Sequence, residues 1–555
     1  MALAAVPRLY LLDIWPGLGS DQAKTGLLAY RFRTYGEIRW NPNIDYIGPV
    51  QTIVVAAMRP VFGTSVRTIR VPVALMAVLA VAVVWGVMRP LLGPRGGLAA
   101  AAIAALNPWL IMSSRYALDP MWLTLPNALL LWAMGGYLRH GRARELLLVG
   151  ALAGLGLTLH PAQIIVLPGL LIVVILGWVL RKVPFRPLRM VACVLVFVIL
   201  AGPVLPYHIK SLLGRQEVAT KKLNIGLQDP AEFFGPAVDI LTGRQLYRYF
   251  GGPVNPDSAW QSLLGITLVG GLGFGAVTLW RRGAFVGRML VVYTLIGVAF
   301  GYGFCSGMNR LSILGHFRYL ICLALLVPMF WAAALVGLTA RGTWRVIRLA
   351  GAGCLIVALA VLPWQLKWYY FDARTRTGGV FETYRSCECD PKQLAAWYIL
   401  HNRLPPDRTV ILAQDYDLYY PLRYFLEDGY HIQTLHPEEF IPLEDQYPFR
   451  ALAANPEATW LIVLYPRSRL GYQIEWNLGQ AGLLRPEHLV YEVRGPEKIP
   501  RGVLALYRIP PSQTRTEWSQ RYLHRMDILR VATQGHIPPS GTGKIPRPSP
   551  VASHP

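Results

Sequence analysis

Long apolar runs fill the middle of the chain, from about residue 71 to residue 367. A helix needs about 20 mostly apolar residues to cross the hydrocarbon core of a bilayer. About ten segments approach this length, at 71–88, 97–112, 120–137, 146–159, 161–180, 190–207, 261–280, 289–304, 317–337 and 349–366. The pattern therefore predicts a mostly α-helical, polytopic membrane bundle over residues 71–367.

The residues before this bundle follow a different pattern. Segment 47–63 is apolar but holds Pro49, Arg59 and Pro60, which favours an interfacial or re-entrant helix over a membrane span. We therefore expect residues 1–70 to form a first exoplasmic loop with interfacial helices. Because no apolar span precedes this loop, either segment 47–63 crosses the membrane or the chain begins late and lacks a first helix. We favour the second interpretation.

After residue 367 the apolar runs shorten to strand length and alternate with helical patterns. Strands are predicted at 409–413, 459–465, 489–494 and 503–508, and helices at 391–402, 418–427 and 470–482. This alternation predicts a small α/β domain over residues 368–510. Residues 511–555 are rich in Pro, Ser and Arg, which predicts a partly disordered tail.

Composition narrows the class of protein. Charged residues make up 15% of the chain and hydrophobic residues 54%, whereas soluble domains carry about 25% charged residues. A soluble enzyme and a disordered chain are therefore excluded. The formal net charge of +23 would suggest nucleic acid as a partner of a soluble protein. The chain has no nucleic-acid-binding motif, so we expect membrane lipids and no nucleic acid as partners.

The position of the basic residues predicts an orientation. Arginines gather in the loops at 89–95, 139–144, 181–189, 281–288 and 341–348, which contain almost no acidic residue apart from Glu145. Cytoplasmic loops of membrane proteins are enriched in Lys and Arg. The loops at 113–119, 208–259 and 305–316, together with both terminal regions, are then expected on the exoplasmic side.

Two acidic residues stand at predicted exoplasmic helix ends. Asp21 lies at the start of a helical pattern, where an N-cap and a catalytic base are both consistent with the sequence. Arg115 and Asp119 are spaced i, i+4 between two spans, which fits either an ion pair or a functional pair at the mouth of the bundle.

Several basic and aromatic residues on the same side are candidates for binding an anion. His316, Arg318 and Tyr319 precede a span and either anchor it at the interface or, through the guanidinium, bind phosphate. His160 lies at another helix junction, where most histidines are structural. Lys210 and Arg244 belong to the long loop 208–259, which is either solvated or a lid over an anionic lipid head group. No metal-binding motif is present, although a divalent cation stays open as a cofactor.

These residues follow an order that resembles the GT-C superfamily of membrane glycosyltransferases. Within it, the chain is similar to the branch of protein O-mannosyltransferases and lipid A aminoarabinose transferases, common in bacteria as dolichyl-phosphate-mannose-type enzymes. The similarity runs from about residue 8 to 370. It rests on Asp21-Gln22-Ala23, Tyr35-Gly36, Asn41-Pro42, Phe62-Gly63, S-R-Y-A-L-D-P at 114–120 and H-F-R-Y-L at 316–320.

The resemblance implies a reaction in a bacterial-type plasma membrane. Such enzymes transfer a sugar, with inversion, from a polyprenyl-phosphate carrier to an acceptor on the exoplasmic face, which here is a protein, lipid or glycan. It implies that Asp21 is the general base and Asp119 the second acidic site, and many relatives have Glu where this chain has Gln22. The donor phosphate would be bound by Arg115, His316, Arg318, Lys210 and Arg244, with Gln22, His160 and Tyr319 as further candidates.

Two other functions stay open at this point. A transporter or flippase would have charges within its spans, broken helices and inverted repeats, and the spans here hold few charges. A catalytically inactive GT-C-like scaffold is the other alternative, because the first helix and one carboxylate of the family pattern are missing.

Overall fold

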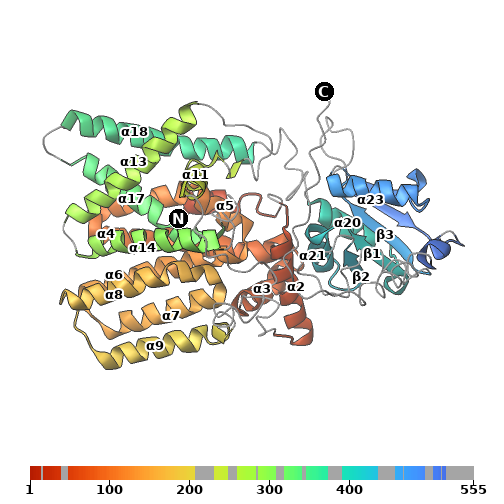
Figure 1. The fold of residues 1–555 in the computed structure, drawn as a ribbon, viewed down its shortest axis with the longest axis horizontal. Helices are drawn as coiled ribbons and strands as arrows, with labels where there is room; N and C mark the ends of the chain where they lie inside the picture. Colours follow the sequence, from red (N-terminus) through yellow and green to blue (C-terminus); the bar gives the residue numbers. More distant parts are fainter. Residues whose placement is uncertain are drawn as a thin grey trace, which may run out of the picture.

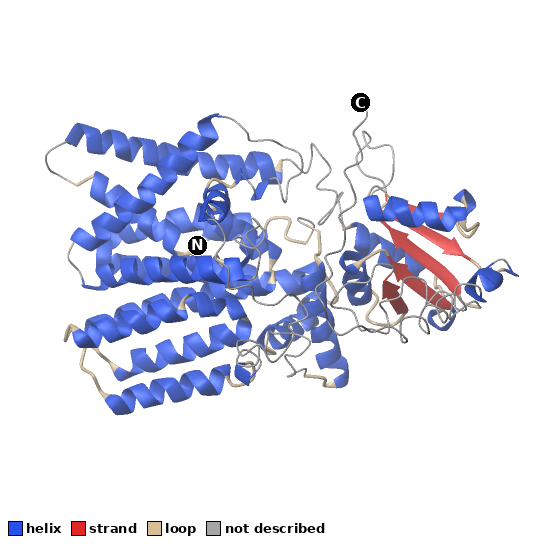
Figure 2. Cartoon of the chain, in the orientation of Figure 1, coloured by secondary structure: helices blue, strands red, loops and turns tan. Residues whose placement is uncertain are grey.

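A computed structural model describes most of the chain, in which a helical bundle and a small α/β domain meet through a few short helices (Figures 1 and 2). The described residues are 1–13, 17–38, 48–206, 230–244, 246–247, 259–282, 285–307, 318–340, 345–372, 390–434, 457–466, 468–493, 504–513 and 515–520. Lys210 and His316, two of the predicted phosphate ligands, lie outside these residues, as do residues 521–555 of the predicted tail.

The bundle contains the long apolar helices that the sequence predicts. Its helices are α4 (Val66–Leu106), α6 (Thr124–His140), α7 (Ala143–Leu159), α8 (Leu167–Val179), α9 (Pro187–Ala201), α11 (Pro230–Leu241), α13 (Ala259–Arg281), α14 (Phe285–Gly307), α16 (Ile321–Ala324), α17 (Leu326–Leu338) and α18 (Arg345–Gln365), the last extended by a π-helical turn, η3 (Leu366–Phe371). Among the described residues, six helical stretches are long and apolar enough to span a membrane.

The other predicted spans are also helical, but they differ in length or continuity. Segments 71–88 and 97–112 fall largely on the two halves of α4, which kinks at Gly93, where φ is 78°. Helices α6 and α7 have 17 residues each and α9 has 15. A helix rises 1.5 Å per residue, so these three are short for the hydrocarbon core.

Short helices precede and connect the long helices of the bundle. They are α1 (Ala2–Leu9), α2 (Ser20–Tyr35), α3 (Val50–Phe62), α5 (Pro108–Tyr116), η1 (Asp119–Leu123) and η2 (Pro161–Ile165). Figure 1 shows α2 and α3 between the bundle helices and α21. The apolar segment 47–63 is therefore mostly helical, as α3, with Pro60 inside the helix.

The α/β domain contains a five-stranded sheet with the strand order β2-β1-β3-β5-β4. Strands β1 (Thr409–Ala413), β2 (His431–Thr434) and β3 (Thr459–Leu464) are parallel, and β5 (Leu504–Ile509) runs antiparallel to β3 and to β4 (Leu489–Val493). The four strands predicted from sequence are thus confirmed. Strand β2 was missed because its residues, H-I-Q-T, lack an apolar run.

Helices cover both faces of this sheet. Alternate residues of β1, Val410 and Leu412, pack in one cluster with Ile474 and Leu478 of α23 (Arg469–Gln480). Ile411 belongs to the main core, together with residues of α20 (Pro391–His401) and α21 (Tyr416–Phe425). The packing continues past residue 510, since the guanidinium of Arg515 lies 4.0 Å from the ring centroid of Trp460.

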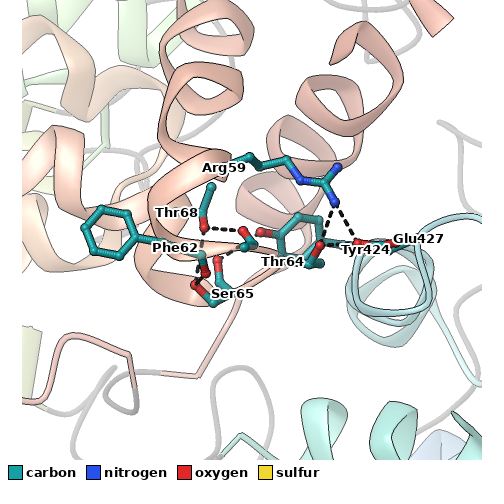
Figure 3. A network of polar contacts seen from close by, with 8 residues as sticks. Arg59, Phe62, Thr64, Ser65, Thr68, Tyr424 and Glu427 are labelled. Atoms are coloured by element: carbon teal, nitrogen blue, oxygen red, sulfur yellow. Dashed lines mark hydrogen bonds and ion pairs between the residues drawn. The ribbon is translucent and has the colours of Figure 1, made fainter. Parts of the chain in front are cut away.

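Helix α21 docks the α/β domain on α2 and on the connection between α3 and α4. Tyr424 donates a hydrogen bond to the carbonyl of Ser65 (2.9 Å), and Arg59 pairs with Glu427 (2.6 Å; Figure 3). The helices approach closely because residue 26 is glycine: a Cβ there would lie 2.6 Å from the Tyr424 ring. This contact brings the first residues of α21 next to the first turn of α2.

Candidate active site

Asp21 lies in the first turn of α2 and is held from two distant parts of the chain. The N-cap of α2 is Gly19, so Asp21 is not the N-cap that its sequence also allowed. Its Oδ2 accepts a hydrogen bond from Nη2 of Arg318 (2.6 Å), and its Oδ1 accepts one from the hydroxyl of Tyr416 (3.0 Å). The side chains of Asp21 and Arg318 are 27% and 12% exposed, respectively, so the ion pair is shielded without being sealed from solvent.

The surroundings of Asp21 favour its ionised form. Burial raises the pKa of Asp21, but the charge of Arg318, the hydrogen bond from Tyr416 and the charge of Lys24 outweigh burial and hold the pKa below its ordinary value. Asp21 is therefore a carboxylate at neutral pH. An ionised carboxylate at a pocket wall is able to accept a proton from a substrate hydroxyl.

A pocket that is partly open to solvent lies beside Asp21. Its polar lining comprises Asp21, Lys24, Thr25, Glu37, Gln51, Thr52 and Asp119. Asp119 is buried, and its Oδ1 accepts a hydrogen bond from the hydroxyl of Thr25 (3.4 Å), one turn after Asp21 on α2. The structure thus brings the two predicted carboxylates to one pocket.

Buried polar contacts fix the wall of this pocket. The side-chain amide of Gln51, on α3, donates to the carbonyls of Asp119 (3.1 Å) and Leu159 (3.0 Å). The next residue after Leu159 is His160, whose Nδ1 accepts from the backbone N–H of Ala162 (3.0 Å). These bonds tie α3 to the two turns that carry Asp119 and His160.

His160 and Tyr319 lie beside Arg318 and support its position. The rings of His160 and Tyr319 stack with their centroids 5.8 Å apart, and both side chains are buried. Phe304 also packs edge-on against Tyr319, with ring centroids 5.6 Å apart. Since Tyr319 follows Arg318 directly, this stack holds the backbone from which the guanidinium reaches Asp21.

The guanidinium of Arg115 donates to backbone carbonyls and not into the pocket, where a phosphate ligand would have to point. The guanidinium is fully buried and donates to the carbonyls of Pro7 (3.0 Å) and Tyr10 (2.5 Å) at the end of α1. It also lies 5.0 Å from the ring centroid of Phe371. Cations stabilise the carboxyl end of a helix, so Arg115 holds α1 in place, and its prediction as a phosphate ligand is corrected.

Gln22 also points away from the pocket. Its side chain is fully buried, and its Oε1 accepts from Nε of Arg70 (2.9 Å). Arg70 donates in addition to the carbonyls of Leu12 (3.1 Å) and Gly17 (2.7 Å). A glutamate at position 22 would therefore face Arg70, and Gln22 organises the segment before α2.

Arg244 lies in another part of the bundle. Its Nη1 is 3.8 Å from a carboxylate oxygen of Asp239, at the end of α11. Close by, the hydroxyl of Tyr247 donates to the carbonyl of Leu362 on α18 (3.4 Å). The described contacts of Arg244 are thus with α11, and Arg244 is not among the residues that line the pocket.

The contribution of the α/β domain to the site was not predicted from the sequence. Besides Tyr416, Asp417 reaches α2, where its Oδ1 accepts from the hydroxyl of Ser20 (2.9 Å). Burial and repulsion by Asp415 raise the pKa of Asp417 to about 6. The run D-Y-D at 415–417 begins two residues after the end of the buried strand β1. Ligands of open α/β sheets bind at the carboxyl ends of strands, so this position was the available clue.

The donor set does not favour a structural metal centre. Within the part of the chain that the structure describes, no group of three or more His, Cys, Asp or Glu side chains is arranged to hold a metal ion. Asp21 and Asp119 line one pocket, but each carboxylate already accepts a hydrogen bond from a neighbouring side chain.

Comparisons with known proteins give a match to a family model over part of the chain and a similarity in fold to solved structures. The family model described as dolichyl-phosphate-mannose-protein mannosyltransferase matches residues 47–207, which include Asp119 and His160. No curated protein sequence matches the chain significantly.

The chain is similar in structure to ArnT from Cupriavidus metallidurans. The apo structure matches with a TM-score of 0.57 and 14% identity, and the structure bound to undecaprenyl phosphate with 0.54 and 15%. Each match covers 91% of this chain and 96% of the other. This fold, together with the six long apolar helices, makes the chain an integral membrane protein.

Proposed function

We propose, on the premise that the chain has the GT-C fold that its sequence resembles and its structural neighbours confirm, that it is an inverting membrane glycosyltransferase. It moves a sugar, a hexose or a pentose, from a polyprenyl-phosphate carrier to an acceptor hydroxyl or phosphate of a protein, lipid or glycan. Its catalytic pocket is the one bounded by Asp21 and Asp119.

The observation that carries this proposal is the ion pair between Asp21 and Arg318 at the edge of the pocket. The two residues are 297 positions apart and their side-chain atoms approach to 2.6 Å. Transfer from a glycosyl phosphate requires a base for the acceptor and positive charge for the departing phosphate. A carboxylate and a guanidinium, side by side, supply both.

The reaction is a direct displacement at the anomeric carbon. A lone pair of the acceptor hydroxyl forms the new glycosidic bond, the bond from the anomeric carbon to the phosphate oxygen breaks, and its electrons leave with the phosphate. Asp21 takes the proton of the acceptor hydroxyl. A guanidinium has five N–H donors, so Arg318 is able to hold Asp21 and a phosphate oxygen together.

The remaining pocket residues position the substrates. Lys24 adds a positive charge one turn from Asp21 for the carrier phosphate. Asp119 and Glu37 are acceptors for sugar hydroxyls on the pocket wall. A polyprenyl carrier fits a protein with six spanning helices, and undecaprenyl phosphate is bound in one of the ArnT structures.

The arginine-rich loops support an exoplasmic position for the pocket. They lie at one end of the spans, for example between α6 and α7, while Asp119 and His160 lie at the opposite ends of those two helices. Because arginines concentrate on the cytoplasmic side, the pocket and the α/β domain face away from the cytoplasm.

The contacts of Gln22 argue against an inactive scaffold. The family pattern often has a glutamate at this position, but here the side chain is buried against Arg70 and not in the pocket. Its replacement by glutamine therefore removes no pocket carboxylate. Asp21, Glu37 and Asp119 all line the pocket.

The test is an activity assay with purified full-length protein, undecaprenyl-phosphate-linked hexoses and pentoses, and membrane extracts as the source of acceptor. We expect covalent sugar transfer by the wild type and a loss of about 10²- to 10⁴-fold for Asp21→Asn, the usual contribution of a general base. The matched control is Asp13→Asn, because Asp13 pairs with Arg67 at the exposed surface.

Three results are distinguished by this design. Transfer by the wild type and by Asp13→Asn, with loss in Asp21→Asn, supports the proposal. Equal turnover of Asp21→Asn and wild type removes Asp21 from its role. Movement of the lipid-linked sugar across vesicles without covalent transfer would instead make the protein a flippase.

A further inference from the structure

The active carboxylate is bonded by a side chain from outside the membrane bundle. The hydroxyl of Tyr416 donates to Oδ1 of Asp21 (3.0 Å), while Arg318 donates to Oδ2 (2.6 Å). The two carboxylate oxygens are thus held by different parts of the fold, one by the bundle and one by the α/β domain. Residues 21 and 416 are 395 positions apart.

The position of Tyr416 is fixed by the domain that carries it. It is the first residue of α21, and the helix is capped by the preceding Asp415, whose Oδ1 accepts from the backbone N–H of Leu418 (3.2 Å). Its ring packs edge-on against Tyr420, with centroids 4.9 Å apart. The hydroxyl is therefore directed by a capped helix next to the end of a buried strand.

A second contact keeps this helix end against α2. Ser20, directly before Asp21, donates to Asp417, directly after Tyr416 (2.9 Å). The backbone N–H of Leu18 donates to Asp390, which caps α20 (2.5 Å). The segment that leads into Asp21 is thus bonded to the α/β domain at Leu18 and Ser20.

We propose that Tyr416 is a positioning residue for the transferase reaction, and that the active site is complete only when the α/β domain is docked on α2. The inference rests on the proposed function. Tyr416 acts through Asp21: its hydrogen bond orients the carboxylate and favours the ionised form that accepts the proton of the acceptor.

Several charged or titratable groups share the environment of Asp21 with Tyr416. They are Lys24 on α2, Arg318 before α16, Asp417 on α21, and Glu37 and Asp119 in the pocket. Removal of the Tyr416 hydroxyl changes none of these charges. It removes one hydrogen bond to the ionised form, so the pKa of Asp21 rises and the acid limb of the rate profile moves to higher pH.

The test compares Tyr416→Phe with Tyr424→Phe in the full-length protein. Both variants remove one hydroxyl of α21 that bonds across the same domain contact, but Tyr424 donates to the backbone of Ser65 and not to Asp21. The readout is kcat/KM for release of undecaprenyl phosphate from an undecaprenyl-phosphate-linked sugar, measured from acidic to alkaline pH. Thermal unfolding of both variants checks folding.

For Tyr416→Phe we expect kcat/KM to fall roughly three- to tenfold at acidic pH, with partial recovery at alkaline pH. Tyr424→Phe should keep the wild-type pH profile. In the Asp21→Asn background, Tyr416→Phe should have no further effect on rate, which a role through Asp21 requires.

Other outcomes overturn the inference. If Tyr416→Phe and Tyr424→Phe lower activity equally at every pH, Tyr416 contributes only to docking. If the profile of Tyr416→Phe superimposes on the wild type, the bond is irrelevant to catalysis while the proposed function stands. A wild type without any transfer activity would overturn the proposed function itself.

Discussion

Two aspartates at opposite ends of the contact between α2 and α21 have similar partners and different surroundings. Asp21, at the start of α2, accepts from Arg318 and Tyr416. Asp428, just beyond α21, accepts from Nε of Arg31 (2.9 Å) and Nε of Arg423 (2.7 Å). In both cases neighbouring donors outweigh burial and lower the pKa of the carboxyl group.

The difference between them is access to the pocket. Asp21 lines it, whereas Asp428 does not. Arginines on both sides leave Asp428 only the task of holding the two helices together, while Asp21 keeps one side open to a substrate. One pair of helices thus carries a docking contact at one end and a candidate catalytic contact at the other.

Of the substitutions that distinguish the two ends of this helix contact, we expect Arg318→Ala to have the largest effect, and we expect that effect on activity. The variant removes the positive charge beside Asp21, which in the proposed reaction also stabilises the departing phosphate, so kcat/KM should fall by about 10²- to 10³-fold. Steady-state kinetics measures the loss. The matched control is Arg67→Ala, which breaks the exposed pair with Asp13 and should leave the rate unchanged. Comparable losses in both variants would contradict the role of Arg318.

At the other end of the contact, around Asp428, we expect a substitution to lower the stability of the protein and not its activity. Asp428→Ala leaves Arg31 and Arg423 facing each other without a counter-charge, and their side chains are only 21% and 22% exposed. We expect a loss of about 1–3 kcal/mol in the free energy of unfolding, read by thermal unfolding in detergent, with the pH profile of the reaction unchanged.

The control for that variant is Asp407→Ala. Asp407 is paired with Arg408 at the surface, where both side chains are more than three-quarters exposed, so its removal should not change stability. An Asp428→Ala protein as stable as the wild type would show that the pair of arginines is held by other contacts.

Most of the fold follows from local patterns in the sequence. Apolar runs predict the bundle helices because the bilayer requires them, and the runs T-V-I-L-A and T-W-L-I-V-L predict β1 and β3 because parallel strands are buried on both faces. Strand β2 cannot be predicted in this way, because it is a strand through its pairing with β1 and not through its own composition. The continuity of α4 across Gly93 is also a tertiary property.

The candidate site is less accessible to sequence reasoning. Asp21, Asp119 and Arg318 are detectable because they are charges at the ends of apolar runs. Arg115 has the same local pattern, yet carbonyls at the end of α1 take its donors. Tyr416 lies beyond the carboxyl end of β1, which marks the edge of the sheet where ligands bind. Its contact with Asp21 cannot be read from that position, because it arises only when residues 395 positions apart come together.

The close approach of the two helices provides a smaller test. Gly26→Ala would place a Cβ 2.6 Å from the Tyr424 ring and 2.8 Å from Ile69, so α2 and α21 must move apart or the ring must shift. Overpacking of this kind costs about 1–3 kcal/mol, measured by thermal unfolding. In Gly26→Ala/Tyr424→Ala, the added cost of the alanine should fall, because only the end of the flexible Ile69 side chain is left to shift. If the cost stays the same, the ring is not the obstacle.

The smallest effect concerns Asp417 and depends on pH. Because the pKa of Asp417 is raised to about 6 in the folded protein, the folded state favours the protonated acid. The stability that this proton contributes is present below the ordinary pKa of an aspartate and is lost as the pH rises through about 6. Asn cannot ionise, so Asp417→Asn should be more stable than the wild type by about 1–2 kcal/mol at pH 7.5, with little difference at pH 4.

Thermal unfolding of both proteins at the two pH values measures this difference. A constant offset between them would mean that the carboxylate of Asp417 is as well solvated in the fold as in the unfolded chain. A stability difference between the two proteins that grows with pH would show that the charge of Asp417 is unfavourable at the docking contact. In mild acid, where Asp417 is protonated, the contact that holds Tyr416 against Asp21 is then more stable. Asp21 itself stays ionised there because its pKa is lowered.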